Sequence, residues 1–324
     1  MHQLILLARI TCIFFVCSVS FSAQAQSYNQ PGFSQQLSVI TENDRYLMQG
    51  RDRYYTNGLM INYQRTGNSK NQSTIKQVHQ YELGQKLFTP FSRKIYDASQ
   101  IDRPVTGYLY GKYTQSNFKE HNQLVQWSAS IGAIGKASLG QGMQNMFHKI
   151  ISVNSDWWGW IWGYQLKSAA GINLHGLYAK GLLNDQTSFV QITPVSQAIA
   201  GMIYTNISQG LLIQLGKFNP LHQSSYWNAS VDDEQTPGTE LFFYYHPELM
   251  YQFYNATVQG GMFLKDKGPI VSEIEPWAVK HQIGAAFAIS RYTLKLEMIL
   301  QGKEARSQHF THNYGGIHLG YRFN

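Results

Sequence analysis

Hydrophobic and polar residues alternate with a period of two along much of this chain. At the C-terminal end, apolar side chains occupy every second position, at Ile317, Leu319, Tyr321 and Phe323, and glycine or polar residues lie between them. Similar alternation runs through 59–64 and 125–131. Successive side chains of a β-strand point to opposite faces, so each run predicts a strand with one apolar and one polar face.

Long polar segments separate these runs, and shorter turns lie between them. The long segments are 43–56, 89–104, 134–162, 219–238, 267–279 and 303–312. Six long loops that alternate with short turns predict twelve strands. The stretch 186–218 is too long for one strand and has few turn residues, so it leaves the count open by two.

The third long segment contains a predicted helix. Ser138 and Gln141 have the spacing of a capping box, and apolar residues follow at helical intervals from Met143 to Ile150. Gln144 and His148 then lie one turn apart on one face. Because a histidine on an amphipathic helix is more commonly structural than catalytic, its role has to be judged from its neighbours.

Composition narrows the class of protein. Charged residues make up 14% of the chain, against about 25% in globular domains, and the chain has 21 tyrosines and 7 tryptophans. No run of about 18 apolar residues follows residue 25, which argues against a membrane-spanning helix. These features are typical of a transmembrane β-barrel. We therefore predict an all-β fold, an antiparallel transmembrane barrel of twelve strands with a short helix in an extracellular loop.

The first 25 residues read as a signal peptide. Arg9 precedes an apolar run over 10–19, and 23–25 has the small-x-small pattern that signal peptidase recognises. Both cysteines, Cys12 and Cys17, fall inside this segment, so the barrel domain predicted over 26–324 has no disulfide or thiolate metal site. The net charge of +7 is spread along the sequence, and an exported chain without a recognition motif is not expected to bind nucleic acid.

Polar residues gather in the first three long loops, which we expect on the outer side of the membrane. Asn43 and Asp44 end the first predicted strand and Thr56 begins the second, so hairpin pairing would bring the three together. The second loop ends in a polar and aromatic cluster at 102–111. The third carries the predicted helix with Gln144 and His148.

Five segments in order resemble the LpxR family of outer-membrane lipid A 3'-O-deacylases. They are END at 42–44, DRYYTNG at 52–58, DRPVTGYLYG at 102–111, QNMFH at 144–148 and WGYQLK at 162–167. The resemblance implies a twelve-stranded barrel whose active site lies between the outer wall and a helix from an extracellular loop. It also implies calcium-dependent hydrolysis of the 3'-linked acyloxyacyl ester of lipid A.

The resemblance also implies roles for individual residues. His148 would be the general base that activates water, and Gln144 would orient the water or the substrate. Asn43, Asp44 and Thr56 would form the facing polar wall, with oxygen atoms that suit calcium.

One departure from the family pattern concerns the metal. Asn154 stands where the family has a glutamate, six residues after the histidine. Asp156 is the alternative carboxylate, and we expect it to join Asp44 as a metal ligand; it could equally be a solvent-facing aspartate. Arg93 and Lys94 are candidates for contact with the anionic groups of lipopolysaccharide, although basic loop residues are commonly only solvated.

Two alternatives remain open at this point. One is a porin-like channel with an incidental loop helix, and the other is a non-catalytic relative with an adhesive or structural role. Our expectation is a monomeric hydrolase in the bacterial outer membrane, with its active site on the cell exterior and lipid A as its substrate.

Overall fold

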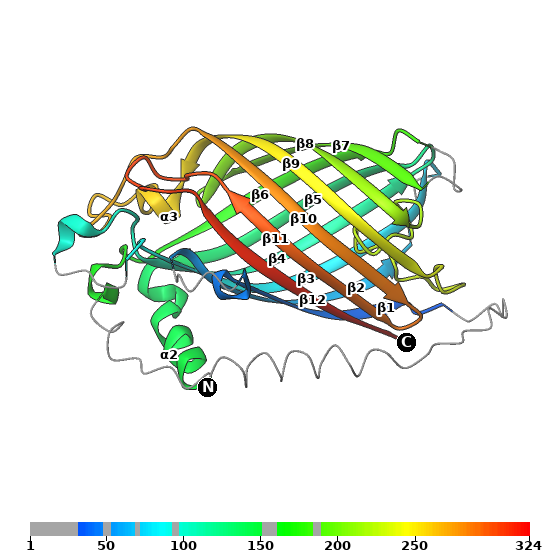
Figure 1. The fold of residues 1–324 in the computed structure, drawn as a ribbon, viewed down its shortest axis with the longest axis horizontal. Coiled ribbons are helices and arrows are strands. Elements are labelled where there is room, and N and C mark those ends of the chain that lie inside the picture. Colours follow the sequence, from blue (N-terminus) through cyan, green and yellow to red (C-terminus); the bar gives the residue numbers. More distant parts are fainter. Residues whose placement is uncertain (1–31, 48–52, 69–71, 93–96, 151–160, 184–188) are drawn as a thin grey trace. The chain divides into compact units, whose positions relative to one another are not determined.

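The computed structural model describes residues 32–47, 53–68, 72–92, 97–150, 161–183 and 189–324. Within these ranges the chain forms a closed antiparallel barrel of twelve strands, shown in Figure 1. Each strand pairs with its neighbours in sequence, and β1 closes the barrel against β12. The fold class and strand number predicted from the alternation are therefore confirmed.

The strands differ in length but keep this simple order. Their bounds are β1 (Gln35–Asn43), β2 (Tyr54–Gly67), β3 (Thr74–Thr89), β4 (Thr106–Lys119), β5 (Gln123–Ile134), β6 (Ala169–Lys180), β7 (Val190–Gly201), β8 (Tyr204–Lys217), β9 (Glu240–Asn255), β10 (Trp277–Ile289), β11 (Tyr292–Gln301) and β12 (His312–Phe323). The ambiguous stretch 186–218 contains two of them, because β7 turns directly into β8 across residues 202–203.

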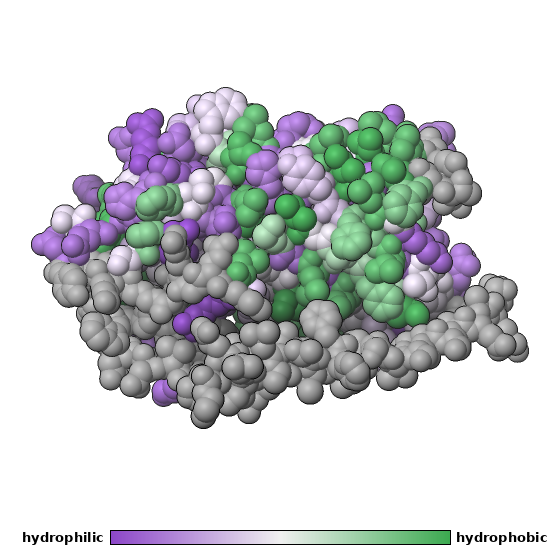
Figure 2. Space-filling model, in the orientation of Figure 1, coloured by the Kyte–Doolittle hydropathy of each residue, from purple (hydrophilic) through white to green (hydrophobic). Residues whose placement is uncertain are grey.

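The alternation assigns one face of each strand to the lumen and the other to the outside. Leu37 pairs with Tyr321 and Val39 with Leu319, and all four side chains are exposed on the outer face. Figure 2 shows hydrophobic residues, in green, gathered over the strands. Among the described residues no helix is long and apolar enough to span a membrane. The apolar outer face is the surface that a barrel presents to lipid.

The two ends of the barrel are built differently. We name one end the loop end, because it carries the connections after β1, β3, β5, β7, β9 and β11. We name the other the terminus end, because β1 starts and β12 ends there. The predicted long loop 219–238 joins β8 to β9 and so lies at the terminus end. At the loop end, the β7–β8 connection is a tight turn instead. Loop length alone therefore misplaced one of the six long loops.

Residues 218–239, named here the lumen plug, enter the barrel at the terminus end. Leu221, Ala229 and Val231 are buried in a cluster with inward-facing Phe118 and Phe242. This explains the length of the connection: its apolar side chains fill the lumen, where they are removed from water.

Polar contacts hold the lumen plug to the strands around it. The Lys76 ammonium on β3 contacts Asp232 Oδ2 at 3.0 Å and the Ala229 carbonyl at 2.9 Å. At the opposite wall, the Tyr226 hydroxyl and His246 Nδ1 on β9 are 3.1 Å apart. The plug is therefore fixed from two sides of the barrel.

Candidate functional site

The predicted helix of the third loop is present as α2 (Gly140–Ile150), which follows the 3-10 turn η3 (Gly135–Ser138). The predicted capping box does not form through Ser138, whose hydroxyl donates instead to the Gly135 carbonyl at 2.6 Å. Leu139 adopts a left-handed conformation, with φ of 58°, between the turn and the helix. The serine therefore closes the preceding turn, and the backbone bends there to direct α2 along the wall.

Helix α2 lies against the outer face of the barrel and not over its lumen. Along β3, Leu83 is 58% exposed on the outer face, whereas Leu87, on the same face, is only 2% exposed. A methyl group added at Gly140 would lie 3.0 Å from the Leu87 side chain, and one at Gly107 of β4 only 2.2 Å from the Ser138 hydroxyl. The two glycines thus allow the helix segment to approach the wall closely. We name this contact the helix–wall seam.

Gln144 is fixed inside the helix–wall seam. Its side chain is buried, and its Oε1 accepts a hydrogen bond of 2.6 Å from the indole N–H of Trp162. Trp162 belongs to the 3-10 turn η4 (Ile161–Tyr164) and packs with Leu87 and Val105. Trp162 is buried and positions the Gln144 side chain. The sequence signal was its place in the WGYQLK segment.

The β1–β2 hairpin brings the polar wall residues together. Asn43 pairs with Asn57, the neighbour of Thr56, and Asp44 begins the 3-10 turn η1 (Asp44–Leu47) directly after β1. The β2–β3 pairing shifts register at Thr56, as in a β-bulge. Asn43, Asp44 and Thr56 are each less than 5% exposed. The hairpin arrangement expected from the sequence is therefore present.

Backbone groups hold these polar side chains in place. Asn43 Oδ1 accepts from the Arg45 amide at 2.8 Å, and Asp44 Oδ2 accepts from the Arg53 amide at 2.7 Å. Thr56 Oγ1 donates a longer bond of 3.4 Å to the Leu87 carbonyl. Leu87 thereby connects the two halves of the site, because its carbonyl meets the hairpin and its side chain lies under α2.

The DRPVTGYLYG segment holds the neighbouring loops together. The Asp102 carboxylate accepts from the Tyr54 hydroxyl at 2.6 Å and from the Phe91 amide at 2.8 Å. Arg103 is fully buried, pairs with Glu304 at 2.9 Å and lies over the Phe88 ring at 4.2 Å. These motif residues therefore support the loop end around the candidate site, a role that the sequence did not reveal.

Some predicted site residues lie outside the described part of the chain. His148 falls on α2, one turn after Gln144, but its side chain is not among those described. Arg93, Lys94, Asn154 and Asp156 also lie outside the described residues. Their roles stay predictions.

The described residues do not by themselves complete a metal site. They contain no group of three His, Cys, Asp or Glu side chains that could hold a metal ion. Asp44, Asn43 and Thr56 nevertheless offer buried carboxylate, amide and hydroxyl oxygens around the β1–β2 hairpin. This donor chemistry fits a hard cation such as calcium, which binds oxygen ligands.

The lumen contains a second concave region, a cavity of about 340 Å³ on the inner side of the wall. It is rich in tyrosine and in charged groups, but the carboxylates are paired. Glu248 contacts Lys280 at 3.2 Å, and Glu304 contacts Arg103 at 2.9 Å. Such pairing satisfies the buried charges internally. The seam and the hairpin, on the outer face, form the better candidate site.

Comparisons with known proteins identify the family of this barrel. A family model described as outer membrane protein LpxR matches residues 10–323. The solved structure of LpxR from Salmonella typhimurium is similar with a TM-score of 0.73 at 19% sequence identity, covering 89% of this chain and 100% of that one. The β domain of the Bordetella autotransporter BrkA aligns with a TM-score of 0.47 at 8% identity, covering 90% and 99%. No curated protein sequence matches this chain.

Proposed function

We propose that this chain, which belongs to the LpxR family of outer-membrane proteins, is a lipid A 3'-O-deacylase that hydrolyses the 3'-linked acyloxyacyl ester. The observation that carries the proposal is the position of α2 on the outer face of the wall. A lipid reaches that face by lateral diffusion in the bilayer, without entering the barrel. An ester of a membrane lipid is therefore the substrate class that this position favours.

The chemistry proposed for the site is general base catalysis by His148. The neutral imidazole removes a proton from water as the water oxygen attacks the ester carbonyl carbon. The intermediate collapses by breaking the bond to the 3' oxygen of the sugar, which takes the proton from the imidazolium. The products are the acyloxyacyl carboxylic acid and a lipid A with a free 3' hydroxyl. An unperturbed histidine pKa of about 6.5 suits this role near neutral pH.

Gln144 is proposed to orient the water or the ester for this attack. Its support is the 2.6 Å hydrogen bond from Trp162, which fixes the amide oxygen and leaves the amide nitrogen as a donor. Because reacting groups gain rate from fixed orientation, a rigid glutamine one turn from the base is useful. In this scheme Trp162 is a positioning residue.

Calcium is proposed as the cofactor, held by Asp44 and Asp156 together with oxygens near Asn43 and Thr56. When bound, the ion would polarise the ester carbonyl and stabilise its developing negative charge. The support in the described residues is the buried set of oxygen donors at the hairpin.

The loop end is proposed to face the cell exterior, so that the site meets lipid A in the outer leaflet. Arg93 and Lys94 are then proposed to contact the anionic groups of lipopolysaccharide. The enzyme is proposed to act as a monomer.

The decisive experiment is mass spectrometry of lipid A from a bacterial host that lacks this activity. Expression of the parent chain should remove one acyloxyacyl group. His148→Asn should lower the initial rate by about 100-fold or more. The matched control is His121→Asn, in an exposed turn at the terminus end, where the left-handed backbone also suits asparagine.

The rates are compared in variants that insert to the same level. Unchanged lipid A in cells that carry a folded parent barrel and sufficient calcium would contradict the proposal. Equal losses in the His148 and His121 variants would remove the histidine from the mechanism.

A further inference from the structure

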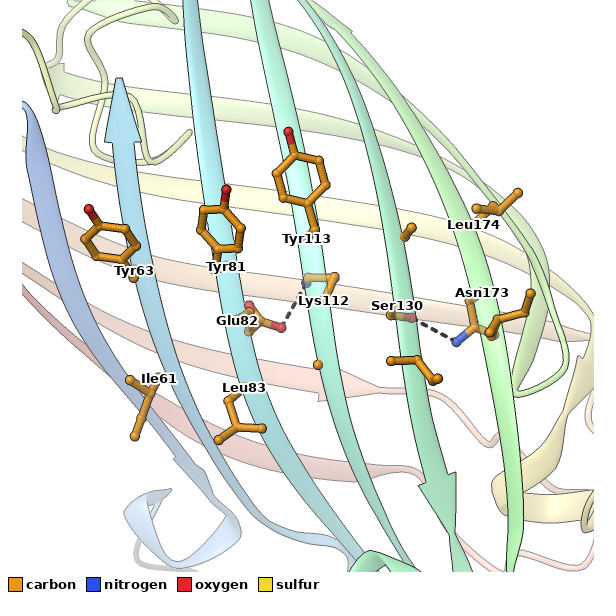
Figure 3. Close-up of a pocket in the computed structure, with 14 residues that line it drawn as sticks. Ile61, Tyr63, Tyr81, Glu82, Leu83, Lys112, Tyr113, Ser130, Asn173 and Leu174 are labelled. Carbon is orange, nitrogen blue, oxygen red and sulfur yellow. Dashed lines mark hydrogen bonds and ion pairs between the residues drawn. The ribbon is translucent and has the colours of Figure 1, made fainter. Parts of the chain in front are cut away.

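The outer wall carries an apolar depression of about 650 Å³ across strands β2 to β6, shown in Figure 3. Its centre is Gly111 on β4, which pairs with Leu83 on β3 and Ile131 on β5. A methyl group added at Gly111 would meet no atom within 4 Å. The depression therefore exists because a glycine stands where the neighbouring strands carry large aliphatic side chains.

A row of aromatic rings borders the depression on the side of the terminus end. Tyr63, Tyr81 and Tyr113 lie on three adjacent strands, and Figure 3 shows them side by side. Their ring centroids are 6.2 Å apart between Tyr63 and Tyr81 and 5.4 Å apart between Tyr81 and Tyr113. The Tyr113 hydroxyl also lies 2.7 Å from His79 Nδ1. We name these three residues the tyrosine ledge.

On strands β3 and β4, the depression lies next to the helix–wall seam, on the side of the terminus end. Leu87 and Gly107 form the outward pair next to α2, and Leu83 and Gly111 form an outward pair four residues further along each strand. At about 3.4 Å per residue, the two pairs are roughly 14 Å apart. A chain that leaves the seam along the wall therefore passes over Gly111 before it reaches the tyrosine ledge.

The surroundings determine what can occupy the depression. Leu83, Ile131 and Leu174 are 58%, 66% and 60% exposed, so the depression is continuous with the apolar outer face that contacts the bilayer. Water has no polar partners on such a surface, and a protein partner would need to replace lipid along the whole wall. The fitting occupant is an acyl chain.

We propose that the depression binds an acyl chain of the lipid A molecule whose ester lies at the helix–wall seam, and that the tyrosine ledge limits the chain length accepted. This inference rests on the proposed function and adds a specificity site to it. Lipid tails surround the wall in any case, so the selection comes from shape and packing and not from transfer out of water. A chain that is too long would meet the rings of the ledge.

Two substitutions with opposite effects test the proposal. Gly111→Phe fills the depression and should reduce the ratio of rates for tetradecanoyl over decanoyl substrates at least fivefold. Tyr113→Ala opens the ledge and should raise the relative rate for hexadecanoyl substrates by a similar factor. The matched control is Gly176→Phe, because Gly176 is exposed on β6 and an added methyl there also meets no atom within 4 Å.

The measurement uses the purified full chain in phospholipid vesicles that contain lipid A of defined chain length, with calcium present. Heat modifiability on gels confirms that each variant is a folded barrel. An active parent whose chain-length ratio is unchanged in Gly111→Phe would overturn the proposal, as would an equal loss on all substrates. A parent that hydrolyses none of them would overturn the proposed function itself.

Discussion

The two faces of the barrel wall use polar groups in opposite ways. On the lumen side, charged residues are numerous and form pairs such as Glu82 with Lys112. On the outer side, Asn43, Asp44 and Thr56 are buried at the loop end, on the hairpin next to the strand that α2 contacts. Backbone amides there donate to Asn43 Oδ1 and to Asp44 Oδ2.

A high density of titratable groups therefore does not mark the candidate site of this barrel. A buried charge is costly unless it is paired, so a polar lumen has to satisfy itself. Polar groups on the lipid-facing side have no such reason to be present. The buried oxygen atoms of the hairpin residues, beside the strand that α2 contacts, are therefore the more informative observation.

The largest expected effect on the hydrolysis rate comes from removal of calcium, which should act at the outer-face site and not in the lumen. Because the proposed ion stabilises the transition state, a chelator should reduce acyl release by about 100-fold or more. Asp44→Asn keeps an acceptor for the Arg53 amide but loses the carboxylate charge, so it should require more calcium for half-maximal rate. Calcium titration of vesicle-bound enzyme measures both effects.

The control for this titration is Glu82→Gln on the lumen side. It alters a lumen ion pair and should leave the calcium dependence unchanged. If Glu82→Gln shifted the titration as much as Asp44→Asn, the outer-face site would be contradicted.

Deletion of the lumen plug should turn a closed barrel into a conducting one. Asn219 Nδ2 donates to the Gly238 carbonyl at 2.7 Å, so residues 220–237 can be removed by joining 219 to 238. Planar-bilayer recordings should show no steady conductance for the parent and open channels for the deletion. A conducting parent would instead favour the porin-like alternative.

Loss of one hydrogen bond at the helix–wall seam should have an intermediate effect on the rate of hydrolysis. Trp162→Phe removes the donor to Gln144, worth about 1–1.5 kcal/mol, and should lower the rate about tenfold. The loss should appear in kcat more than in KM if the glutamine acts in the transition state.

The matched control is Trp227→Phe in the lumen plug, where the buried indole N–H has no partner among the described residues. This variant should retain the parental rate. An unaltered rate in Trp162→Phe would show that Gln144 does not depend on this bond.

The smallest expected effect is the loss, in acid, of the stability that one ion pair of the lumen plug contributes. Burial would raise the pKa of Asp232, but the Lys76 ammonium and the backbone amides of Glu234 and Gln235 lower it below the ordinary 3.8. His222, Asp233 and Arg322 also face this pair. The pair should therefore stabilise the fold above pH 3.8 and lose that contribution as the pH falls through the lower folded pKa.

Urea unfolding of the refolded barrel at several pH values measures this contribution. Lys76→Met should lower the free energy of unfolding by about 1–3 kcal/mol at neutral pH, because Asp232 loses its cation. Its deficit relative to the parent should shrink in acid. A deficit independent of pH would assign the effect to packing.

The barrel could be predicted from the pattern of residues along the chain. Alternation depends only on neighbouring residues, and a period of two puts apolar side chains on one face wherever the strand lies. The helix at Gly140–Ile150 and the hairpin that joins Asn43 to Thr56 were predictable for the same reason, because each depends on local spacing.

The packing of the connections between strands could not be predicted in this way, because it depends on contacts between distant segments. Residues 218–239 enter the lumen because Phe118 and Phe242, far apart in sequence, form an apolar pocket there. Trp162 is buried because Leu87 and Val105 form its surroundings. The depression at Gly111 likewise exists only between Leu83 and Ile131 of the adjacent strands. Such sites depend on surfaces assembled from distant segments, and no local pattern of residues specifies them.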